Sequence, residues 1–332
     1  MTVLCCPDKF RGSLTAPEAA AAMCRGVERA GYDARPLPLA DGGEGTLAAI
    51  LGSREGTLHS TRVTGPDGRI VEAGWAALTD GTAIVEMARA SGLALVGRND
   101  PLTASTYGTG ELIAAAIAHG CRRVIVGVGG SATTDGGLGA LDALGWTLHG
   151  ADVEVACDVT TTFLDAPAIF GPQKGASPAD VEVLEKRLRE LARRFDALHG
   201  VNVASLPGSG AAGGLAGGLA VLGARIVNGF DVVAAATGFG AALEASSALI
   251  TGEGKVDAST LTGKVVARVL DAARIAGRPA AVIAGAIVPA VALEVPARAL
   301  NSMESSNTFR DAPVLVEAAA FDLAEELVGT TR

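Results

Sequence analysis

The sequence predicts an α/β protein with two domains, and three observations support this prediction. At 332 residues, the chain exceeds the length at which one hydrophobic core usually stops growing. Hydrophobic residues make up 49% of it, with 44 glycines but only 4% aromatics, a composition typical of closely packed helices and sheets. Both ends of the chain also repeat the order strand, polar loop, helix. We therefore expect helices packed on sheets rather than a coiled coil or a disordered chain.

The first fifty residues read as two successive units of strand, loop and helix. The expected strands are 3–6 and 34–39, and the charged loops 7–13 and 41–46 follow them. Thr15 opens the capping-box pattern Thr-Ala-Pro-Glu, which predicts where the first helix begins. In an open parallel sheet, loops that follow the strands lie at one edge, and ligands bind there.

The middle of the chain changes to the two-residue alternation of hairpins, and the end returns to the first pattern. Between residues 59 and 95, short apolar runs alternate with turns such as Pro-Asp-Gly-Arg. The other expected elements are a helix at 107–119, strands from 124 and at 151–157, a charged helix at 179–198, a strand at 248–251, a helix at 262–276 and a strand at 280–287. Residues 1–60 with 245–332 are thus expected to form one domain, and residues 61–244 an inserted one.

Charge and cysteine content exclude several classes of protein. The net charge of -9 argues against a nucleic-acid or anionic-membrane binder, because no broad basic field is available. The five cysteines are scattered without a Cys-x-x-Cys pair, so neither a disulfide framework nor a zinc site is indicated. No signal peptide opens the chain, and Pro289 and Glu294 interrupt the apolar segment 280–296. A cytoplasmic protein is expected, and the sequence leaves a homodimer open as an alternative to a monomer.

The glycine-rich stretch 124–146 is the strongest local signal for a ligand. A β-branched strand leads into a loop with Ser131, Thr133, Thr134 and Asp135, and a helical pattern follows. Glycines let backbone N–H groups approach an anion, and a helix N-terminus adds partial positive charge, so a phosphate site is one hypothesis. A tight strand-to-helix turn without a ligand is the alternative.

Polar residues that could carry chemistry concentrate in four loops, 7–13, 41–46, 131–135 and 251–257, each after an expected strand. Phosphoryl transfer needs cations or backbone donors around the phosphates, carboxylates for Mg²⁺, and a base for the attacking hydroxyl. The candidate cations are Lys9, Arg11, Lys174, Lys255 and Lys264. The candidate carboxylates are Asp8, Asp41, Glu44, Asp135, Asp158, Glu253 and Asp257.

Several common motifs are absent. The Thr-Gly-Lys at 262–264 fails as a Walker A motif, because Ala258 and Val265 stand where Gly and Ser or Thr are needed. No Gly-x-Gly-x-x-Gly opens the first unit, which disfavours a dinucleotide-dependent oxidoreductase. The histidines have no metal-ligand spacing and neighbour no nucleophile elbow, so we expect them at the surface: His59, His119, His149 and His199.

Successive motifs over nearly the whole chain resemble those of the bacterial type I glycerate kinase family, in the family's order. They read PDKFRGSL, PLADGGEGT, VEMARASGL, GVGGSATTDGGLGALDALG, FGPQKGA, PGSGAAGGLAGGL and ITGEGKVD followed by TGK. The resemblance implies phosphorylation of D-glycerate, at the 2-hydroxyl in most type I members, with ATP and Mg²⁺. It also implies a flavodoxin-like parallel-sheet domain built from both chain ends, an inserted mixed-sheet α/β domain and an active site in the cleft.

The resemblance also suggests roles for individual residues. The base is expected to be Asp158 or Asp41, and Lys9 joins these two as a catalytic residue. The expected substrate-binding residues are Asp8, Arg11, Ser13, Gly42, Gly43 and Lys174. The expected cofactor-binding residues are Gly129, Gly130, Ser131, Glu253 and Lys255, and the expected metal ligands are Asp135 and Asp257. For each carboxylate, the alternative is a capping or turn role.

The chain departs from the family pattern in three places. Thr160 to Phe163 replace the usual Asn-Pro-Leu-x-Gly after Asp158, Thr134 replaces Asn, and Ala258 to Thr260 replace the usual Gln. If these segments shape the acceptor pocket, the substrate is a relative of glycerate or the activity is weaker. A kinase that forms 3-phosphoglycerate, a related hydroxy-acid kinase and a non-catalytic ligand-binding homologue therefore stay open as alternatives.

Overall fold

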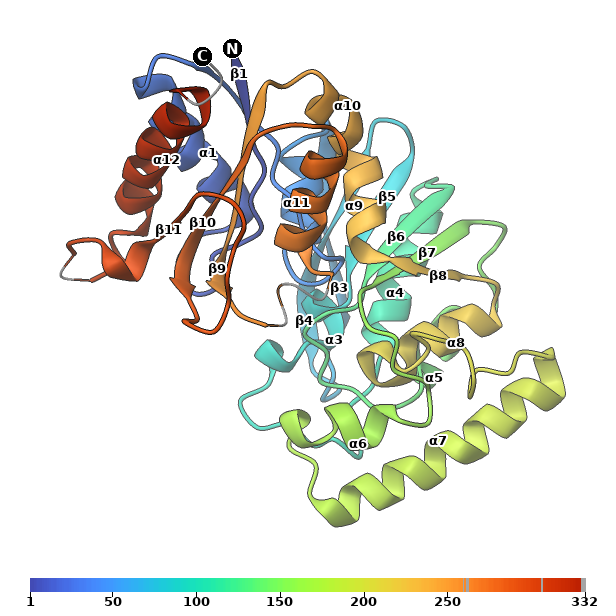
Figure 1. Cartoon of the computed structure of the whole chain (residues 1–332). Helices are drawn as coiled ribbons and strands as arrows, with labels where there is room; N and C mark the ends of the chain where they lie inside the picture. Colours follow the sequence, from blue (N-terminus) through green and yellow to red (C-terminus); the bar gives the residue numbers. More distant parts are fainter. Residues whose placement is uncertain (259, 261–262, 306, 330–332) are drawn as a thin grey trace. The chain divides into compact units, whose positions relative to one another are not determined.

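The protein is an α/β protein of two compact units, as predicted (Figure 1). A computed structural model describes residues 1–258, 260, 263–305 and 307–329. Unit 1 comprises Met1–Asp41, Ala48–Arg54 and Phe230–Arg332, and unit 2 comprises Gly42–Leu47 and Glu55–Gly229. The domain limits expected after residues 60 and 244 stay a prediction beside this division. Both ends of the chain belong to unit 1.

Unit 1 is built on a five-stranded sheet in which all neighbouring strands are parallel. Its strands are β1 (Thr2–Cys5), β2 (Asp33–Pro36), β9 (Ala248–Val256), β10 (Ala280–Ile287) and β11 (Ala297–Ala299). Their order is β2-β1-β9-β10-β11, which is 2-1-3-4-5 when they are counted along unit 1. This is the flavodoxin order. From β1, the chain adds β2 on one side of the sheet and then β9, β10 and β11 on the other, so the switch point lies between β1 and β9. Ligands of such sheets bind beyond the carboxyl ends of the strands at this switch point.

Helices cover both faces of the unit 1 sheet. α1 (Ala16–Arg29) and α12 (Ala312–Gly329) pack on one face, and α11 (Val265–Ile275) lies on the other (Figure 1). Parallel strands covered on both sides need apolar residues on both, and neighbouring β10 residues such as Val282 and Ile283 belong to different core clusters. The other helices in these parts of the chain are α2 (Thr46–Leu51), α9 (Gly229–Thr237) and α10 (Phe239–Glu244).

The predicted capping box at the start of α1 is present. The Thr15 side chain accepts a hydrogen bond from the Glu18 N–H, and Glu18 Oε2 accepts one from the Thr15 N–H at 2.8 Å. Replacing Thr15 with alanine is expected to lower the free energy of unfolding by about 1 kcal/mol. Urea denaturation measures this change. Thr15→Ser keeps the acceptor oxygen and should retain wild-type stability, and an equal loss in both variants would contradict the capping role.

Unit 2 is built on a six-stranded mixed sheet, as predicted. Its strands are β3 (Gly56–Thr64), β4 (Ile70–Leu78), β5 (Thr82–Glu86), β6 (Arg123–Gly127), β7 (Asp152–Cys157) and β8 (Arg225–Asn228). They lie in sequence order; β3, β4 and β5 pair antiparallel, and β5 through β8 pair parallel. The predicted Pro-Asp-Gly-Arg turn connects β3 to β4, and the loop of residues 128–137 follows β6.

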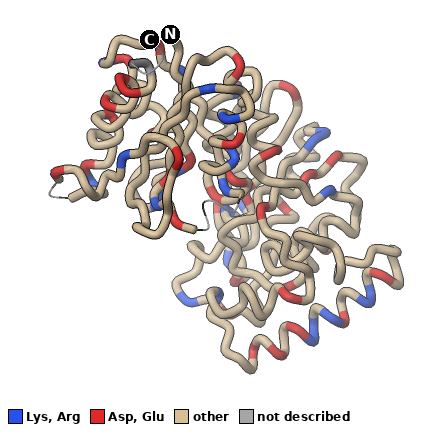
Figure 2. Tube along the Cα trace, viewed as in Figure 1, with Lys and Arg blue, Asp and Glu red and all other residues tan. Residues whose placement is uncertain are grey.

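The helices of unit 2 include short α-helices near the glycine-rich loops and one long charged helix. They are α3 (Ala88–Ser91), α4 (Tyr107–Ala118), α5 (Leu138–Ala143), α6 (Ala166–Phe170), α7 (Pro178–His199) and α8 (Leu215–Val221). Acidic and basic residues alternate along α7 (Figure 2), and its apolar face packs in one cluster with Leu141 and Phe163. The charged residues of α7 therefore form a mostly solvated face, as expected.

One expected loop is a strand. We expected a strand over 248–251 and a loop over 251–257, but β9 continues to Val256. The reason is pairing with β10, in which Gly252 lies beside Ile283 and Lys255 beside Ala286. Side chains alternate along a strand, so Glu253 and Lys255 share one face of the sheet and Gly254 lies on the other.

Two other expected boundaries shift. β2 ends at Pro36 rather than at Leu39, although the N–H groups of Leu37 and Leu39 still donate to the Cys5 and Pro7 carbonyls beside them. The helix expected from Thr262 begins in the structure at Val265, and Thr262 lies outside the described residues.

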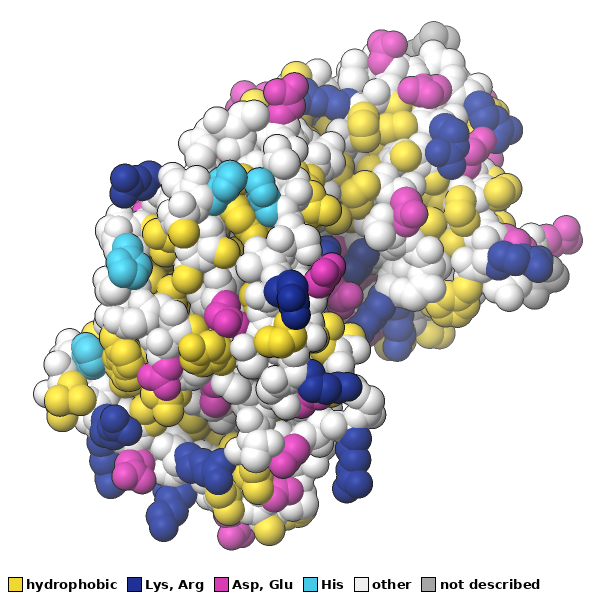
Figure 3. Space-filling view, turned by 180° about the vertical axis from the view of Figure 1, so that it is seen from behind, with side chains coloured by type: hydrophobic (Ala, Val, Ile, Leu, Met, Phe, Trp, Pro, Cys, Tyr) yellow, Lys and Arg dark blue, Asp and Glu magenta, His cyan; other side chains and the backbone are white. Residues whose placement is uncertain are grey.

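The structure also shows where the cysteines, the charged side chains and the histidines lie. The five cysteines are buried and free. On the face seen in Figure 3, basic side chains lie among acidic ones rather than in one continuous field. Among the described helices, none combines the length and the apolar character needed to cross a membrane. Three histidines are exposed as predicted, whereas His59 is half-buried and its ring stacks on Trp75 with centroids 4.5 Å apart.

Candidate functional site

A pocket of about 780 Å³ lies in unit 1 beyond the carboxyl ends of β1 and β9, at the switch point of the sheet. Half of the residues expected at the site line it: Asp8, Lys9, Arg11, Ser13, Asp41, Glu253, Lys255 and Asp257. Lys264, a candidate cation, also lines the pocket. Residues about 245 positions apart in the chain meet here because β1 and β9 are neighbours in the sheet.

Backbone hydrogen bonds continue the sheet beyond β1 and position Asp8. The Cys6 N–H donates to the Ile250 carbonyl and the Asp8 N–H to the Gly252 carbonyl, each at 2.9 Å. The Leu39 N–H in turn donates to the Pro7 carbonyl at 2.9 Å, which brings the chain toward Asp41 on the same side. The loops after β1 and β2 therefore reach the same edge, as the parallel order predicts.

Gly254 explains how closely the loop after β1 approaches β9. A Cβ atom at Gly254 would lie 2.8 Å from the Arg11 backbone nitrogen, a distance that real Cβ atoms do not show. Absence of a side chain thus lets the segment with Phe10 and Arg11 lie directly over the strand. Glycine at this position therefore shapes the floor of the pocket, which it also lines.

Acidic and basic groups are mixed within this pocket. Its carboxylates are Asp8, Asp41, Glu253 and Asp257, and its cations are Lys9, Arg11, Lys255 and Lys264. Lys9 Nζ lies 3.7 Å from Asp8 Oδ1, and the Lys9 N–H donates to the same oxygen at 2.7 Å. Such a lining can neutralise an anionic ligand with its cations while its carboxylates accept a proton or bind a cation.

Asp8 has the most perturbed carboxyl group of the pocket. Its side chain is only 12% exposed, and burial raises its pKa from 3.8 to about 7. The charge of Lys9 lowers the pKa, whereas the nearby negative charges of Asp41 and Glu253 raise it further. A carboxyl group with a pKa near neutrality can accept a proton and release it under ordinary conditions, as a general base must.

Glu253 offers a second buried oxygen. Burial raises its pKa, while a hydrogen bond from Thr260 and the charge of Lys264 lower it. Its Oε1 atom is buried and has no hydrogen-bond partner among the described residues. A buried carboxylate oxygen without a partner is costly, so a cation or a ligand donor at this place would stabilise it.

The carboxylates of this pocket could hold a magnesium ion together with the phosphates of a ligand. Within the described ranges, no group of three or more His, Cys, Asp or Glu side chains is arranged to hold a metal ion. Magnesium is commonly held by one or two carboxylates together with substrate phosphates and water. The free Glu253 oxygen, beside the charges of Asp41 and Asp257, fits that mode of binding.

The glycine-rich loop after β6 contacts other backbone segments of unit 2. A Cβ at Gly129 would lie 2.8 Å from Gly43 Cα, and one at Gly42 would lie 2.7 Å from Gly229 Cα. Gly130 has a φ of +72°, and Ser131 forms a β-bridge with Gly92. The small residues expected to contact ligands thus also serve close backbone packing, so their roles in ligand binding stay predictions.

Asp135 is the most hydrogen-bonded carboxylate of this loop. Its Oδ2 accepts hydrogen bonds from the Thr106 N–H and hydroxyl at 2.8 Å and from the Gly139 N–H at 3.3 Å, and its Oδ1 accepts one from the Gly137 N–H at 3.1 Å. Burial raises its pKa and these bonds lower it. A metal bound to Asp135 would have to share these oxygens with four donors, and its expected role as a metal ligand stays a prediction.

Lys174 is buried beside the same loop. Its Nζ donates to the Thr133 carbonyl at 2.6 Å, and the residue is 3% exposed. Burial lowers its pKa from 10.5 to about 7, whereas the charge of Asp135 raises it. Asn99 Nδ2 donates to the carbonyls of Ala132 and Lys174, which holds the two segments together. In this position Lys174 positions the loop, and substrate binding by it stays a prediction.

Replacing Lys174 with methionine is expected to lower the free energy of unfolding by about 1–3 kcal/mol at pH 9, because the Thr133 carbonyl loses its donor. Between about pH 7 and the ordinary lysine pKa of 10.5, the unfolded chain keeps the proton that the folded chain releases. The contribution of Lys174 to the free energy of unfolding of the wild type therefore rises with pH. The loss caused by Lys174→Met should be smaller at pH 7 than at pH 9. Urea denaturation at both pH values measures it. Lys186→Met, at an exposed position on α7, is the control, and equal losses would contradict this role.

The remaining expected residues lie outside the unit 1 pocket. Asp158 follows β7 in unit 2 and is exposed. Gly42, Gly43, Gly129, Gly130, Ser131, Asp135 and Lys174 also belong to unit 2. The structure therefore collects one half of the expected residues in a single pocket and distributes the other half over the loops of the second unit.

Several contributing residues were not identified from the sequence. Glu86 is buried at the end of β5, where its Oε1 accepts hydrogen bonds from the N–H groups of Gly45 and Leu47 at 2.8 and 3.0 Å. A charged residue at the end of the apolar run 83–85 was the available signal. Asn301, Asn307 and Phe309 line the unit 1 pocket, and no local pattern marked them.

Comparisons with known proteins agree on one family. A family model described as the glycerate kinase family matches residues 3–154 and 147–328. A glycerate kinase of Halalkalibacterium halodurans is 38% identical over 325 residues, which cover 86% of this chain and 86% of that protein. A glycerate 2-kinase of Escherichia coli K12 is 38% identical over 327 residues, with the same coverage of both chains.

A solved structure supports the same relationship. This chain is similar to a structure described as a glycerate kinase 2 from Salmonella typhimurium LT2, with a TM-score of 0.87 and 34% sequence identity. The match covers 100% of this chain and 99% of that one. The similarity therefore extends over both units and is not limited to one motif.

Proposed function

We propose that this chain, which belongs to the glycerate kinase family, transfers the γ-phosphoryl group of ATP to the 2-hydroxyl of D-glycerate. The family membership makes the protein a kinase with an alcohol group as acceptor. The choice of the 2-hydroxyl follows the name of the E. coli relative. A cytoplasmic location belongs to the same proposal, in keeping with five free cysteines.

The observation that carries the proposal is the switch-point pocket of unit 1. It places a buried carboxyl group with a pKa of about 7, Asp8, among the cations Lys9 and Arg11. Glycerate carries one carboxylate and two hydroxyl groups. Its carboxylate needs a cation for binding, and the hydroxyl that receives the phosphoryl group needs a proton acceptor. Arg11 presents a planar donor group suited to a carboxylate, and Lys9 a point charge suited to a phosphate.

The chain's own groups suit an in-line transfer. The hydroxyl oxygen of glycerate forms the new P–O bond, the bond between the γ-phosphorus and its bridging oxygen breaks, and ADP leaves. The hydroxyl proton goes to a carboxylate, for which Asp8 is the best-placed group in the pocket; Asp41 and Asp158 are the other candidates. Lys9, Lys255 and Lys264 are placed to neutralise charge on the transferred phosphoryl group.

ATP and Mg²⁺ are part of the proposal. Asp41, Glu253 and Asp257 would hold the metal together with the phosphates, and the metal would neutralise charge on them. The loop at Gly129, Gly130 and Ser131 stays a proposed contact to the nucleotide, and Asp135 a proposed second carboxylate toward the metal. Gly42, Gly43 and Lys174 stay proposed substrate contacts.

The activity can be tested by ADP release over a panel of hydroxy acids. D-glycerate with Mg²⁺ and ATP is expected to give the highest kcat/KM, and NMR of the product is expected to show phosphate on the 2-hydroxyl. Phosphate on the 3-hydroxyl would change the regiochemistry but keep the kinase. Nucleotide binding without turnover on any acid in the panel would refute the proposal and indicate a non-catalytic homologue.

A further inference from the structure

The switch-point pocket of unit 1 has a charged end and a neutral end. Its carboxylates and cations come from the loops after β1 and β2, from β9 and from the segment that follows β9. The described lining residues from the end of β10 and from the segment after β11 carry no charge, and they include Asn301, Asn307 and Phe309. On the basis of the proposed function with ATP, we infer that this neutral end holds the adenine ring of the nucleotide, which stacks on Phe309.

Phe309 presents an aromatic ring with much of its surface in solvent. The residue is 67% exposed although it lines the pocket. A Cβ atom at Gly12 would lie 3.4 Å from Phe309 Cε1, so the edge of the ring lies close to the backbone next to Arg11. A planar base can stack on such a ring and remove its apolar surface from water. Phe309 therefore offers a stacking surface directly beside the loop that carries the cations Lys9 and Arg11.

Two carboxamide side chains accompany the ring and favour adenine over guanine. Asn301 can donate and accept a hydrogen bond at once, which matches the amino group and N7 on the edge of adenine. Asn307 Oδ1 accepts the Arg310 N–H at 3.1 Å, which fixes this side chain at the pocket. The corresponding edge of guanine carries two acceptors and suits arginine or lysine. Arg310 does not line the pocket, and it pairs with Asp311 at 3.0 Å.

Glycerate does not match the neutral end. Each of its carbons carries a polar group, so it has no ring to place on Phe309, and its carboxylate needs the cations of the charged end. The phosphates of a nucleotide need cations too, whereas its base is planar and uncharged. A nucleotide therefore lies along the carboxyl edge of the sheet, with its phosphates beyond β1 and β9 and its base beyond β10 and β11.

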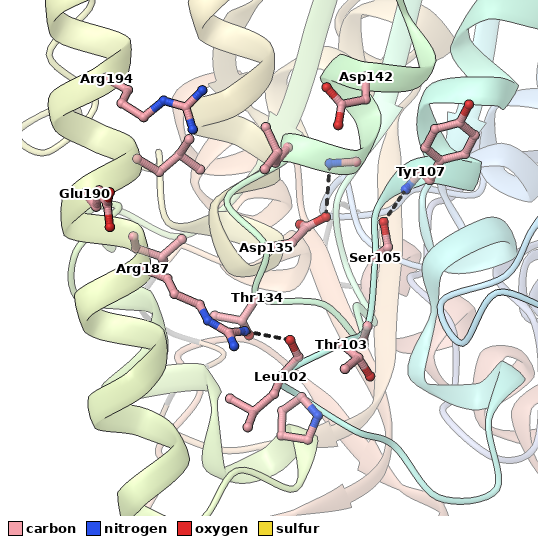
Figure 4. A pocket seen from close by; sticks show the side chains of 16 residues that line it. Leu102, Thr103, Ser105, Tyr107, Thr134, Asp135, Asp142, Arg187, Glu190 and Arg194 are labelled. Atoms are coloured by element: carbon pink, nitrogen blue, oxygen red, sulfur yellow. Dashed lines mark hydrogen bonds between the residues drawn. The ribbon is translucent and has the colours of Figure 1, made fainter.

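A second pocket, of about 510 Å³ in unit 2, is less suited to a nucleotide (Figure 4). Its charged lining residues are the carboxylates Asp135, Asp142 and Glu190 and the arginines Arg187 and Arg194. Negative charges outnumber positive ones there and would repel phosphates. The unit 1 pocket has as many cations as carboxylates, so it is the better place for the phosphates and hence for the base attached to them.

Calorimetric titration of the full chain with ADP and Mg²⁺, and separately with inorganic tripolyphosphate, tests the neutral end. Phe309→Ala is expected to weaken ADP binding about tenfold, because the base loses its stacking partner, and to leave tripolyphosphate binding unchanged. Phe309→Tyr keeps the ring and should retain the ADP affinity. The matched control is Val314→Ala, which removes an apolar side chain that is 69% exposed and lies outside the pocket. Wild type should also bind ADP more tightly than GDP, and Asn301→Leu should reduce this preference.

Equal ADP isotherms for Phe309→Ala and Val314→Ala would overturn the inference. An equal loss of affinity for ADP and for tripolyphosphate in Phe309→Ala would do the same, because it would indicate a general change of the pocket rather than the loss of a base contact. Failure of the proposed kinase activity has a different signature, which is ADP binding that depends on Phe309 without turnover of any hydroxy acid. Turnover with an unchanged KM for ATP in Phe309→Ala would instead retain the kinase and refute the adenine site.

Discussion

Replacing Asp8 with asparagine is expected to lower kcat for D-glycerate phosphorylation at least about 100-fold at pH 8. Asparagine has nearly the same shape but cannot accept the proton of the attacking hydroxyl. Asp8 is the carboxyl group of the switch-point pocket that is both buried and shifted to a pKa of about 7. Coupled ADP-release kinetics measure the effect, and a kcat within about threefold of wild type would contradict the role of Asp8.

Loss of folding does not explain this expected result. The asparagine oxygen can still accept the Lys9 N–H that Asp8 Oδ1 accepts at 2.7 Å. Because the pKa of Asp8 is raised on folding, its stabilising contribution is lost as pH rises from about 4 toward about 7. The variant avoids this buried charge, so its free energy of unfolding at pH 8 should be no lower than that of wild type. Asp271→Asn, at an exposed position on α11, is the matched control for kinetics.

Replacing Asp41 with asparagine is expected to lower kcat at least about 100-fold and to raise the Mg²⁺ concentration needed for half-maximal rate. Asp41 lines the same pocket, and its charge acts on both Asp8 and Glu253. Its removal should also lower the pKa of Asp8, because the Asp41 charge raises it. A reduced kcat with unchanged Mg²⁺ dependence would assign Asp41 to positioning rather than to the metal.

Asp158 provides the comparison that decides between the candidate bases. The sequence placed it beside Asp41 as the expected base, whereas in the structure it is an exposed residue of unit 2. If Asp158 is the base, Asp158→Asn loses at least about 100-fold in kcat and Asp8→Asn does not. If Asp8 is the base, the order of the two effects reverses. A large loss of kcat in both variants would indicate that one of the two residues accepts the proton and the other binds the metal.

Local patterns in the sequence predicted much of the fold. The capping box at Thr15 and the strand 280–287 depend on neighbouring residues, and both were located correctly. β9 was predicted too short because Gly252 to Val256 become a strand only through their pairing with β10. Pairing between distant segments is not visible in a window of adjacent residues, so the length of that strand could not be read from the sequence.

The sequence indicated that some polar loop residues would come together, but it did not indicate the state of their groups. Polar loops after parallel strands pointed to Asp8, Asp41 and Glu253 together, and these residues do line one pocket. The raised pKa of Asp8 results from burial and from charges far away in the chain, which no local motif records. The four hydrogen bonds to Asp135 likewise depend on Thr106, which lies 29 residues earlier.

The pH dependence of kcat/KM for D-glycerate tests most directly whether Asp8 accepts the proton. With wild-type protein, kcat/KM is expected to rise with pH through an apparent pKa of about 7, as Asp8 loses its proton. The midpoint should fall to lower pH in Asp41→Asn, and this step should be absent from the residual activity of Asp8→Asn. A profile with the same step near pH 7 in wild type and in Asp8→Asn would contradict the assignment of the base.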